Sequence, residues 1–135
     1  MSWIDEEVKR EKEAEARRRK ISDDALGLVR ELLNEIDARI AEAKSKGKRV
    51  LTALQGAAIP YDRQFSLDSE QSESKRMLNL KHLEDQAAFE VTGDLKQLTL
   101  TMDLNAKGET CLMHDGKPVS IPKAGQLILK PFLFP

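Results

Sequence analysis

The sequence predicts an α+β protein, in which a long or kinked N-terminal helix over about residues 3–46 precedes an antiparallel sheet of about five strands. Residues 3–20 consist almost wholly of Glu, Lys, Arg and Ala, which are good helix formers. Residues 98–104 alternate apolar and polar side chains, as a half-buried strand does. We expect a charged helical arm, residues 1–21, followed by a single α+β domain, residues 22–135.

The arm is a helix that its own side chains can stabilise. Ser2 stands where it can cap the first turn. Acidic residues precede basic ones by four positions at several places, and each such pair contributes about 0.2–0.5 kcal/mol in an isolated helix. These pairs are Asp5 with Lys9, Glu6 with Arg10, Glu13 with Arg17, and Glu15 with Arg19. The arm can therefore remain helical with little packing against the rest of the chain.

A change of character at Ser22 marks a second helix or a kinked continuation of the first, because two acidic residues follow this possible cap. Beyond it, one face is apolar with heptad spacing, and Leu32 widens that face. Its members are Leu26, Val29, Leu33, Ile36, Ile40 and Ala43. Such a face is either a coiled-coil seam or the side of a helix that covers a sheet, and we expect the second. Gly47 predicts the end of the helix.

The segment after the helix has a weaker pattern. Residues 49–55 hold an apolar run that fits a buried strand or a helical turn, and periodicity does not decide between the two. Residues 62–76 contain four serines and few apolar residues, which predicts a mobile polar loop. Phe65 and Leu67 can form a short strand at its base.

The remaining chain predicts a β meander around the strand at residues 98–104. Residues 77–82 and 88–92 precede it as strands, with Gly93 and Asp94 as a turn.

A turn at residues 105–108 follows this strand. The dipeptide Asp115-Gly116 then predicts a two-residue hairpin turn between residues 109–114 and 117–121. We expect residues 126–134 to close the sheet as a last strand. Pro118 and Pro131 lack the N–H that a strand ladder uses, so we expect them at sheet edges or strand ends.

Composition excludes several classes of site. Net charge is −1, and residues 1–22 carry seven basic and six acidic residues. The sequence therefore lacks the excess of basic residues that is typical of a nucleic-acid-binding surface. The single cysteine, Cys111, excludes an intramolecular disulfide and a cysteine-only zinc site. No phosphate-binding glycine motif occurs, and we expect neither a cofactor nor a metal. The absence of a secretory pattern and of an apolar run of about 20 residues predicts a cytoplasmic protein without membrane insertion.

Four residues are candidates for a polar pocket: His82, Cys111, His114 and Asp115. The neighbours His114 and Asp115 suggest acid–base chemistry, but the geometry of an Asp-Gly turn explains them equally simply. Cys111 lies three residues before His114, which in a strand places the two side chains on opposite faces. His82 has acidic neighbours but no ligand-spaced partners. We therefore predict no catalytic residue and no metal site.

The arm holds the residues that the predicted fold does not need. Trp3, Ile4 and Val8 are its large apolar residues, and aromatic residues are favoured anchors in protein interfaces. Arg17, Arg18 and Arg19 belong to the one basic run, which can bind phosphate or form a solvated helix face, and we favour the solvated face. With Trp3, Ile4 and Val8, these three arginines are the candidate interaction residues of the arm.

These observations favour a non-enzymatic protein–protein interaction or assembly module, in which the arm binds a protein partner or forms a homo-oligomer with itself. The alternative is a small ligand-binding or catalytic domain with a pocket between sheet and helix. That alternative needs the four polar candidates to converge in one concave site.

Overall fold

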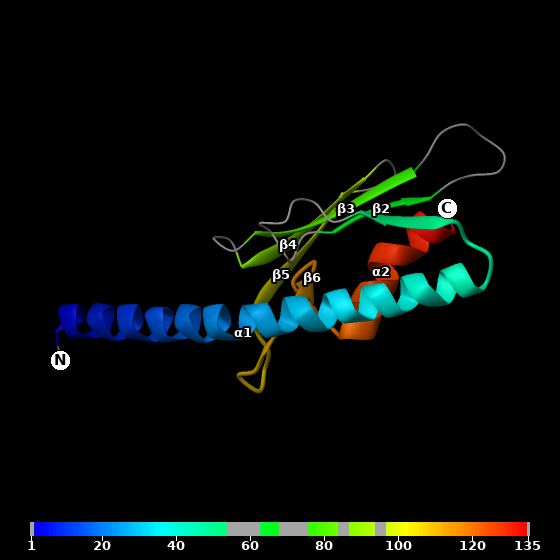
Figure 1. Ribbon diagram of the computed structural model, residues 1–135. Coiled ribbons are helices and arrows are strands. Elements are labelled where there is room, and N and C mark those ends of the chain that lie inside the picture. Colours follow the sequence, from blue (N-terminus) through cyan, green and yellow to red (C-terminus); the bar gives the residue numbers. More distant parts are fainter. Residues whose placement is uncertain (1, 54–62, 68–75, 84–86, 94–96, 135) are drawn as a thin grey trace.

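The computed structural model describes residues 2–53, 63–67, 76–83, 87–93 and 97–134, which form two helices and seven strands (Figure 1). All strand pairs are antiparallel, and the strands lie in the sheet in chain order. The elements are α1 (Trp3–Ser45), β1 (Val50–Ala53), β2 (Arg63–Leu67), β3 (Arg76–Leu83), β4 (Ala88–Gly93), β5 (Leu98–Leu104), β6 (Thr110–His114), β7 (Lys117–Val119) and α2 (Ile121–Leu133). The predicted α+β class and meander are confirmed, but the sheet has seven strands instead of about five.

The molecule has two layers, because α1 and α2 pack side by side against one face of the sheet (Figure 1). Alternate residues of each strand point to that face, as the pleat of a strand requires. One continuous core results, with Phe65, Leu80, Phe89, Leu100 and Leu112 almost fully buried under the helices.

Helix α1 is a single helix of 43 residues that continues through Ser22 without interruption. Ser2 caps its start as predicted, since the Ser2 hydroxyl accepts a hydrogen bond from the Asp5 N–H at 3.3 Å. Its end is a Schellman motif. The Lys48 N–H bonds to the Ala43 carbonyl at 3.0 Å, and Gly47 takes a left-handed φ of 99°. The predicted end of the helix at Gly47 is confirmed.

The apolar stripe of α1 lies on the sheet and not in a coiled coil. Its buried members are Ile21, Ala25, Val29, Leu32, Leu33, Ile36, Ile40 and Ala43. The expectation for Leu26 is wrong, because Leu26 is 43% exposed while Ala25 is buried. A straight helix repeats every 3.6 residues, so its contact line drifts away from a strict heptad spacing over several turns.

Helix α2 overturns the prediction of a last strand at residues 126–134. Ser120 caps this helix by accepting a hydrogen bond from the Lys123 N–H at 3.3 Å, and Pro122 sits in the first turn, where no N–H is needed. The buried residues then recur at helical spacing: Ala124, Gly125, Ile128, Leu129, Phe132 and Leu133. Pro131 therefore lies in the last turns of a helix, not at a strand end.

The remaining local predictions have mixed outcomes. Asp115 and Gly116 both have positive φ, 52° and 77°, so the predicted hairpin turn is confirmed. Pro118 lies in the edge strand β7, as expected. The run at residues 49–55 contains the edge strand β1.

Other predictions fall partly outside the described residues. The short strand predicted at Phe65 and Leu67 is β2, whereas residues 68–75 of the polar segment lie outside the described residues. Asp94 of the predicted turn also lies outside them.

Two glycines provide a test of the packing between β3 and β4. A Cβ at Gly93 would collide with the backbone oxygen of Met77, whereas a Cβ at Gly27 of α1 would meet nothing within 4 Å. We expect Gly93→Ala to lower the free energy of unfolding by about 1–3 kcal/mol, the usual range for overpacking. Gly27→Ala should raise it by about 0.5–1 kcal/mol, because alanine favours the helix. Urea unfolding measures both changes in the free energy of unfolding. A Gly93→Ala variant as stable as the wild type would contradict the β3–β4 register.

Candidate functional site

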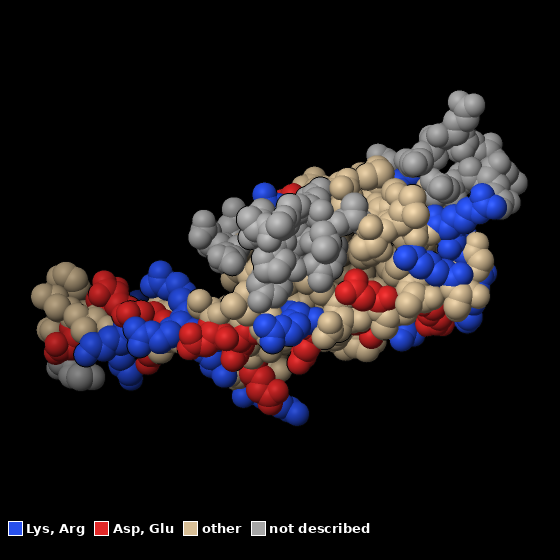
Figure 2. All heavy atoms as spheres, viewed as in Figure 1, with Lys and Arg blue, Asp and Glu red and all other residues tan. Residues whose placement is uncertain are grey.

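The arm projects from the body of the molecule as the free half of α1 (Figure 1). Every residue from position 2 to position 20 is exposed. In Figure 2 positive and negative side chains mix along the arm, and uncharged atoms gather near its end. Residues 3–16, which precede Arg17, extend about 21 Å at 1.5 Å per residue.

The arm tip, residues 3–8, combines apolar and acidic side chains. Trp3 is 74% exposed, Ile4 54% and Val8 42%. The three residues between Ile4 and Val8 are Asp5, Glu6 and Glu7, of which Glu7 pairs with Arg10 just beyond the tip at 3.2 Å. This is an exposed apolar patch with a negative charge beside it.

The root of the arm is fastened to strand β5 by Arg17. Its Nε and Nη2 atoms donate to Oδ1 of Asp103 at 3.1 and 2.6 Å. The Arg17 guanidinium, together with a hydrogen bond from the Leu104 N–H, holds the pKa of the Asp103 carboxyl below its ordinary value of 3.8. Arg17 therefore does not form the ion pair with Glu13 that the helical spacing predicts.

A second polar contact ties α1 to strand β6 about two helical turns further on. The Thr110 hydroxyl donates to Asp24 at 2.7 Å, and Lys20 lies 3.4 Å from the same carboxylate oxygen. The hydroxyl contact, followed by Lys20, lowers the pKa of Asp24. Together with the buried side chain of Ile21, these contacts fix where the arm leaves the body.

The arginines of the predicted basic run lie in different environments. Arg17 bonds to Asp103, and Arg19 pairs with Glu15 of the helix at 3.2 Å. Arg18 instead lines a hollow of about 390 Å³ between α1 and the sheet. Four consecutive basic residues thus form no single phosphate-facing surface.

The four polar pocket candidates do not converge. His82 lies on β3 in the hollow that Arg18 lines. His114 lies on β6 beside α2, in a hollow of about 60 Å³, with its Nε2 atom 3.6 Å from the exposed Asp115 carboxylate. Cys111 alternates with Leu112, so its side chain points to the sheet face opposite the core.

The Cys111 thiol lies in surroundings that disfavour a thiolate. Burial, followed by the negative charges of Asp103 and Glu109, raises the pKa of this thiol above its ordinary value of 9.0. Reactive cysteines have the opposite surroundings, with cations or helix N-termini that lower the pKa. Cys111 is therefore poorly placed to act as a nucleophile.

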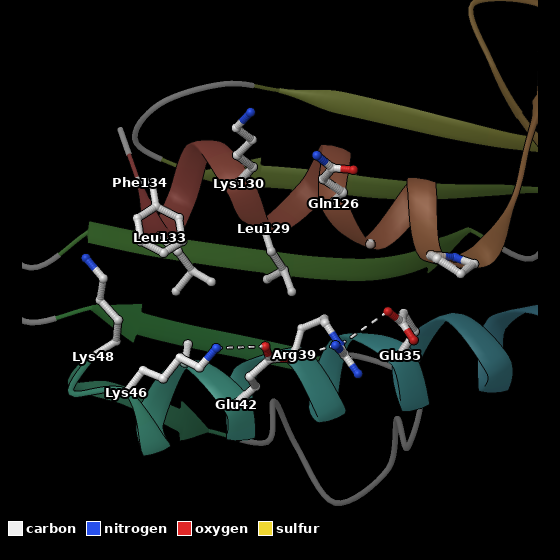
Figure 3. A pocket seen from close by; sticks show the side chains of 13 residues that line it. Glu35, Arg39, Glu42, Lys46, Lys48, Gln126, Leu129, Lys130, Leu133 and Phe134 are labelled. Atoms are coloured by element: carbon white, nitrogen blue, oxygen red, sulfur yellow. Dashed lines mark hydrogen bonds and ion pairs between the residues drawn. The ribbon is translucent and has the colours of Figure 1, made fainter.

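A larger concave site, the interhelical groove, lies between the C-terminal half of α1 and α2 (Figure 3). Its volume is about 640 Å³. Ala43, Leu129, Leu133 and Phe134 supply its apolar surface, and Phe134 is 62% exposed. The Lys48 ammonium lies 4.6 Å from the centre of the Phe134 ring, within the range of a cation–π contact.

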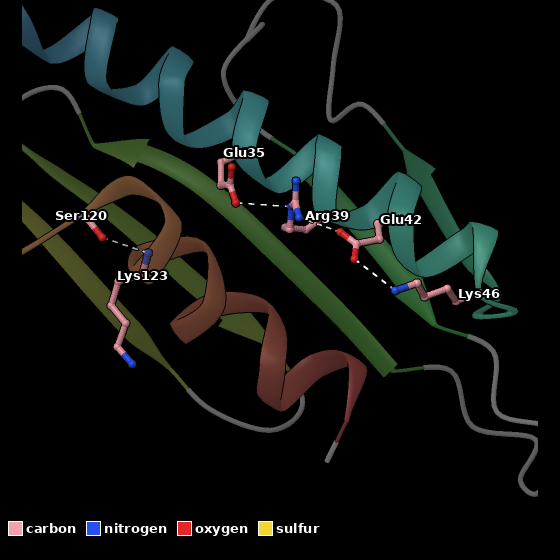
Figure 4. A network of polar contacts seen from close by, with 6 residues as sticks. All are labelled: Glu35, Arg39, Glu42, Lys46, Ser120 and Lys123. Carbon is pink, nitrogen blue, oxygen red and sulfur yellow. Dashed lines mark hydrogen bonds and ion pairs between the residues drawn. The ribbon is translucent and has the colours of Figure 1, made fainter.

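The rim of the interhelical groove is positively charged. On α1, Arg39 contacts Glu35 at 3.4 Å and Glu42 at 2.6 Å, and Lys46 lies 3.4 Å from Glu42 (Figure 4). These two acids are matched by two bases. Lys48 and Lys130 add two more positive charges, and neither has a carboxylate partner among the described residues.

Sequence reasoning missed the interhelical groove because it assigned residues 126–134 to a strand. The available signals were Ser120 followed by Pro122, a cap and a first-turn proline. Close approach of the two helices also depends on Gly125, where an added Cβ would lie 3.1 Å from Cγ of Glu35.

Two kinds of site are absent from the part of the chain that the structure describes. Within it, no three His, Cys, Asp or Glu side chains gather so that they could hold a metal ion. Neither α1 nor α2 has the length and apolar composition needed to span a membrane.

The Arg17–Asp103 contact predicts a dependence of stability on pH. Because the Asp103 pKa is lowered on folding, its contribution is fully present above the ordinary value of 3.8 and is lost as pH falls through the lower folded value. Asp103→Asn should reduce the free energy of unfolding at neutral pH by about 0.2–1 kcal/mol, as for an exposed ion pair. This difference from the wild type should shrink below about pH 4.

Urea unfolding across that pH range measures the effect. Asp37→Asn, which removes an exposed carboxylate from α1, controls for the loss of charge alone. A pH-independent difference between Asp103→Asn and the wild type would contradict the role of the Asp103 charge.

The surroundings of Cys111 predict slow alkylation. At mildly basic pH, iodoacetamide should react more slowly with Cys111 than with free cysteine, because less thiolate is present. Asp103→Asn should accelerate the reaction, since it removes one of the negative charges that raise the thiol pKa. Alkylation of Cys111 as fast as that of a catalytic cysteine would contradict a raised thiol pKa.

Comparison with known proteins assigns this chain to no family, because no family model, curated protein or solved structure matches it.

Proposed function

We propose that this protein is a non-enzymatic interaction or assembly module whose helical arm carries the binding surface. The observation that supports it best is Trp3, a 74% exposed tryptophan at the end of a helix that is anchored in the core. Tryptophan is among the residues that most often dominate binding energy in protein interfaces. A single compact domain gains no stability from placing one so far from its core.

Helix α1 holds the arm tip in a defined direction. The same helix is buried along one face from Ile21 to Ala43 and exposed before it. An arm that continues a packed helix loses less conformational freedom on binding than a flexible tail does. The contacts of Arg17 and Asp24 with the sheet also hold the root of the arm in a fixed direction.

The contact made by the arm is a terminal one and not a long coiled coil. After Ile4 and Val8, the next positions on that face are Glu11, Lys12 and Glu15, which do not form an apolar seam. The heptad stripe beyond Ser22 is covered by the protein's own sheet. Binding through the arm therefore depends on its first two turns.

The small size of the tip favours a concave partner. Standard interfaces bury about 800 Å² on each side, and one aromatic side chain supplies about 150–250 Å². Trp3, Ile4 and Val8 alone fall short of this area on a flat surface. Inserted into an apolar groove, the same side chains are buried on several sides. The partner in this proposal is a protein with such a groove, or another copy of this chain.

The single cysteine of the chain is compatible with a reducing compartment, so we place the protein in the cytoplasm.

A catalytic or ligand-binding pocket, the alternative function, has less support. It requires His82, Cys111, His114 and Asp115 to share one site, and these residues lie apart.

The triple variant Trp3→Ala, Ile4→Ala, Val8→Ala tests the proposal. These exposed positions contribute nothing to the core, and alanine favours the helix, so the fold should be retained. We expect self-association or partner binding to weaken at least about 30-fold, as for loss of a hot-spot anchor worth about 2 kcal/mol. Sedimentation velocity across a concentration series and pull-down with a tagged chain measure the two kinds of association.

Leu26→Ala is the matched control, because Leu26 lies on the same helix and is as exposed as Val8. It should leave association unchanged. Removal of residues 2–16 should have the effect of the triple variant and keep the body folded, since Arg17 and Ile21 remain. A wild-type protein that is monomeric and binds nothing at high concentration would contradict the proposal.

A further inference from the structure

The interhelical groove has the chemistry of a site for an acidic apolar helix. It presents an exposed aromatic ring, Phe134, above a floor of Leu129 and Leu133. Its two unmatched charges, Lys48 and Lys130, are both positive. In Figure 3 the Lys48 side chain extends toward the Phe134 ring, whereas the Lys130 side chain points to the side of α2 away from α1. A ligand that fits must offer apolar side chains and negative charge within a short distance.

The arm tip offers this combination. Trp3, Ile4 and Val8 are exposed. Asp5 and Glu6 lie among them with no basic partner among the described residues, whereas Glu7 pairs with Arg10 at 3.2 Å. Ile4 and Val8 are four residues apart and lie on one face, with Trp3 beside them. Amphipathic helices that bind hydrophobic grooves use anchors at this spacing.

We propose that the interhelical groove binds the arm tip of a second copy of this chain, so that copies associate head to tail. This inference rests on the proposed function of the arm and names its partner. The groove volume of about 640 Å³ lies within the range of roughly 300–1,000 Å³ of pockets that hold drug-sized molecules. A tryptophan with a neighbouring aliphatic side chain fits such a site. Charge complementarity between the tip and Lys48 and Lys130 selects this occupant.

Binding of the tip to the groove of its own chain is excluded by geometry. The tip and the groove lie at opposite ends of one straight helix (Figure 1). The 35 residues from Ile4 to Arg39 correspond to about 50 Å at 1.5 Å per residue. The contact is therefore between chains.

A head-to-tail contact has a distinct consequence for assembly. Each copy keeps one free tip or one free groove after it has bound a neighbour. Such heterologous contacts produce rings if the rotation closes and open chains if it does not. The mass of the assembly should then rise with concentration beyond that of a dimer.

Two sets of variants test the two sides of the contact, the arm tip and the interhelical groove, one at a time. The tip variant is the triple alanine change at Trp3, Ile4 and Val8. The groove variant is Lys48→Glu with Lys130→Glu, which places negative charges opposite the acidic tip and should weaken association at least about tenfold. Phe134→Ala is a second groove variant that leaves the charge unchanged. Lys81→Glu with Lys107→Glu is the control, because these exposed lysines lie outside the groove.

Mixing the variants is the decisive experiment. At a concentration close to the dissociation constant of the wild-type contact, each of the tip and groove variants should sediment largely as a monomer, because one half of its contact is weakened. An equimolar mixture should form a one-to-one complex, since the tip variant has an intact groove and the groove variant has an intact tip. Urea unfolding and circular dichroism of each variant confirm that the fold is retained. The complex should weaken as salt is added, because charges at its rim are screened.

The same experiment separates failure of this inference from failure of the proposed function. If the groove variants self-associate like the wild type while the tip variant does not, the arm binds elsewhere and the groove proposal is overturned. A mixture that remains monomeric also overturns it. If wild-type chains do not self-associate but pull-down shows tip-dependent binding to another protein, the proposed function stands and the head-to-tail contact does not.

Discussion

Burial of one stripe of α1 against the sheet is the interaction on which the rest of the molecule depends. Val29, Leu32 and Ile36 have no exposed surface, and burying a side chain of this size contributes about 1.5–3 kcal/mol. With α2, the stripe covers the apolar face of a seven-stranded meander that would otherwise meet water. It also positions α1 beside α2, and so creates the interhelical groove. Both candidate surfaces follow from the direction of this one helix.

The division of α1 into two halves has a physical basis in its side chains. The half from Ile21 onward is held by tertiary packing. The half before it is held by the Ser2 cap and by pairs such as Arg19 with Glu15. Because the two halves form one hydrogen-bonded helix, packing of the second fixes the direction of the first. An arm with no core of its own thereby acquires a defined position, which an interaction surface requires.

Unmatched charges of opposite sign lie near the two ends of α1, although positive and negative side chains mix along the arm (Figure 2). The arm tip holds Asp5 and Glu6 beside its apolar side chains, whereas Lys48 and Lys130 line the groove beside an apolar floor. The length of α1 keeps these two complementary ends apart within one chain. This asymmetry distinguishes a head-to-tail arrangement from a two-fold one, in which a single surface would have to complement itself.

Features that depend on neighbouring residues can be predicted from the sequence alone, whereas segments that are ambiguous in isolation take their structure from tertiary packing. Ser2 caps the start of helix α1 and Gly47 follows its end, as predicted, and Asp115 and Gly116 adopt the positive φ angles of the predicted turn. Local hydrogen bonds and backbone preferences are sufficient to determine each of these features. Residues 126–134 have an apolar pattern that suits a strand or a helix, and packing beside α1 selected the helix. The interhelical groove could not be predicted from the sequence either. Its walls come from segments far apart in the chain, and only their packing in three dimensions brings them together.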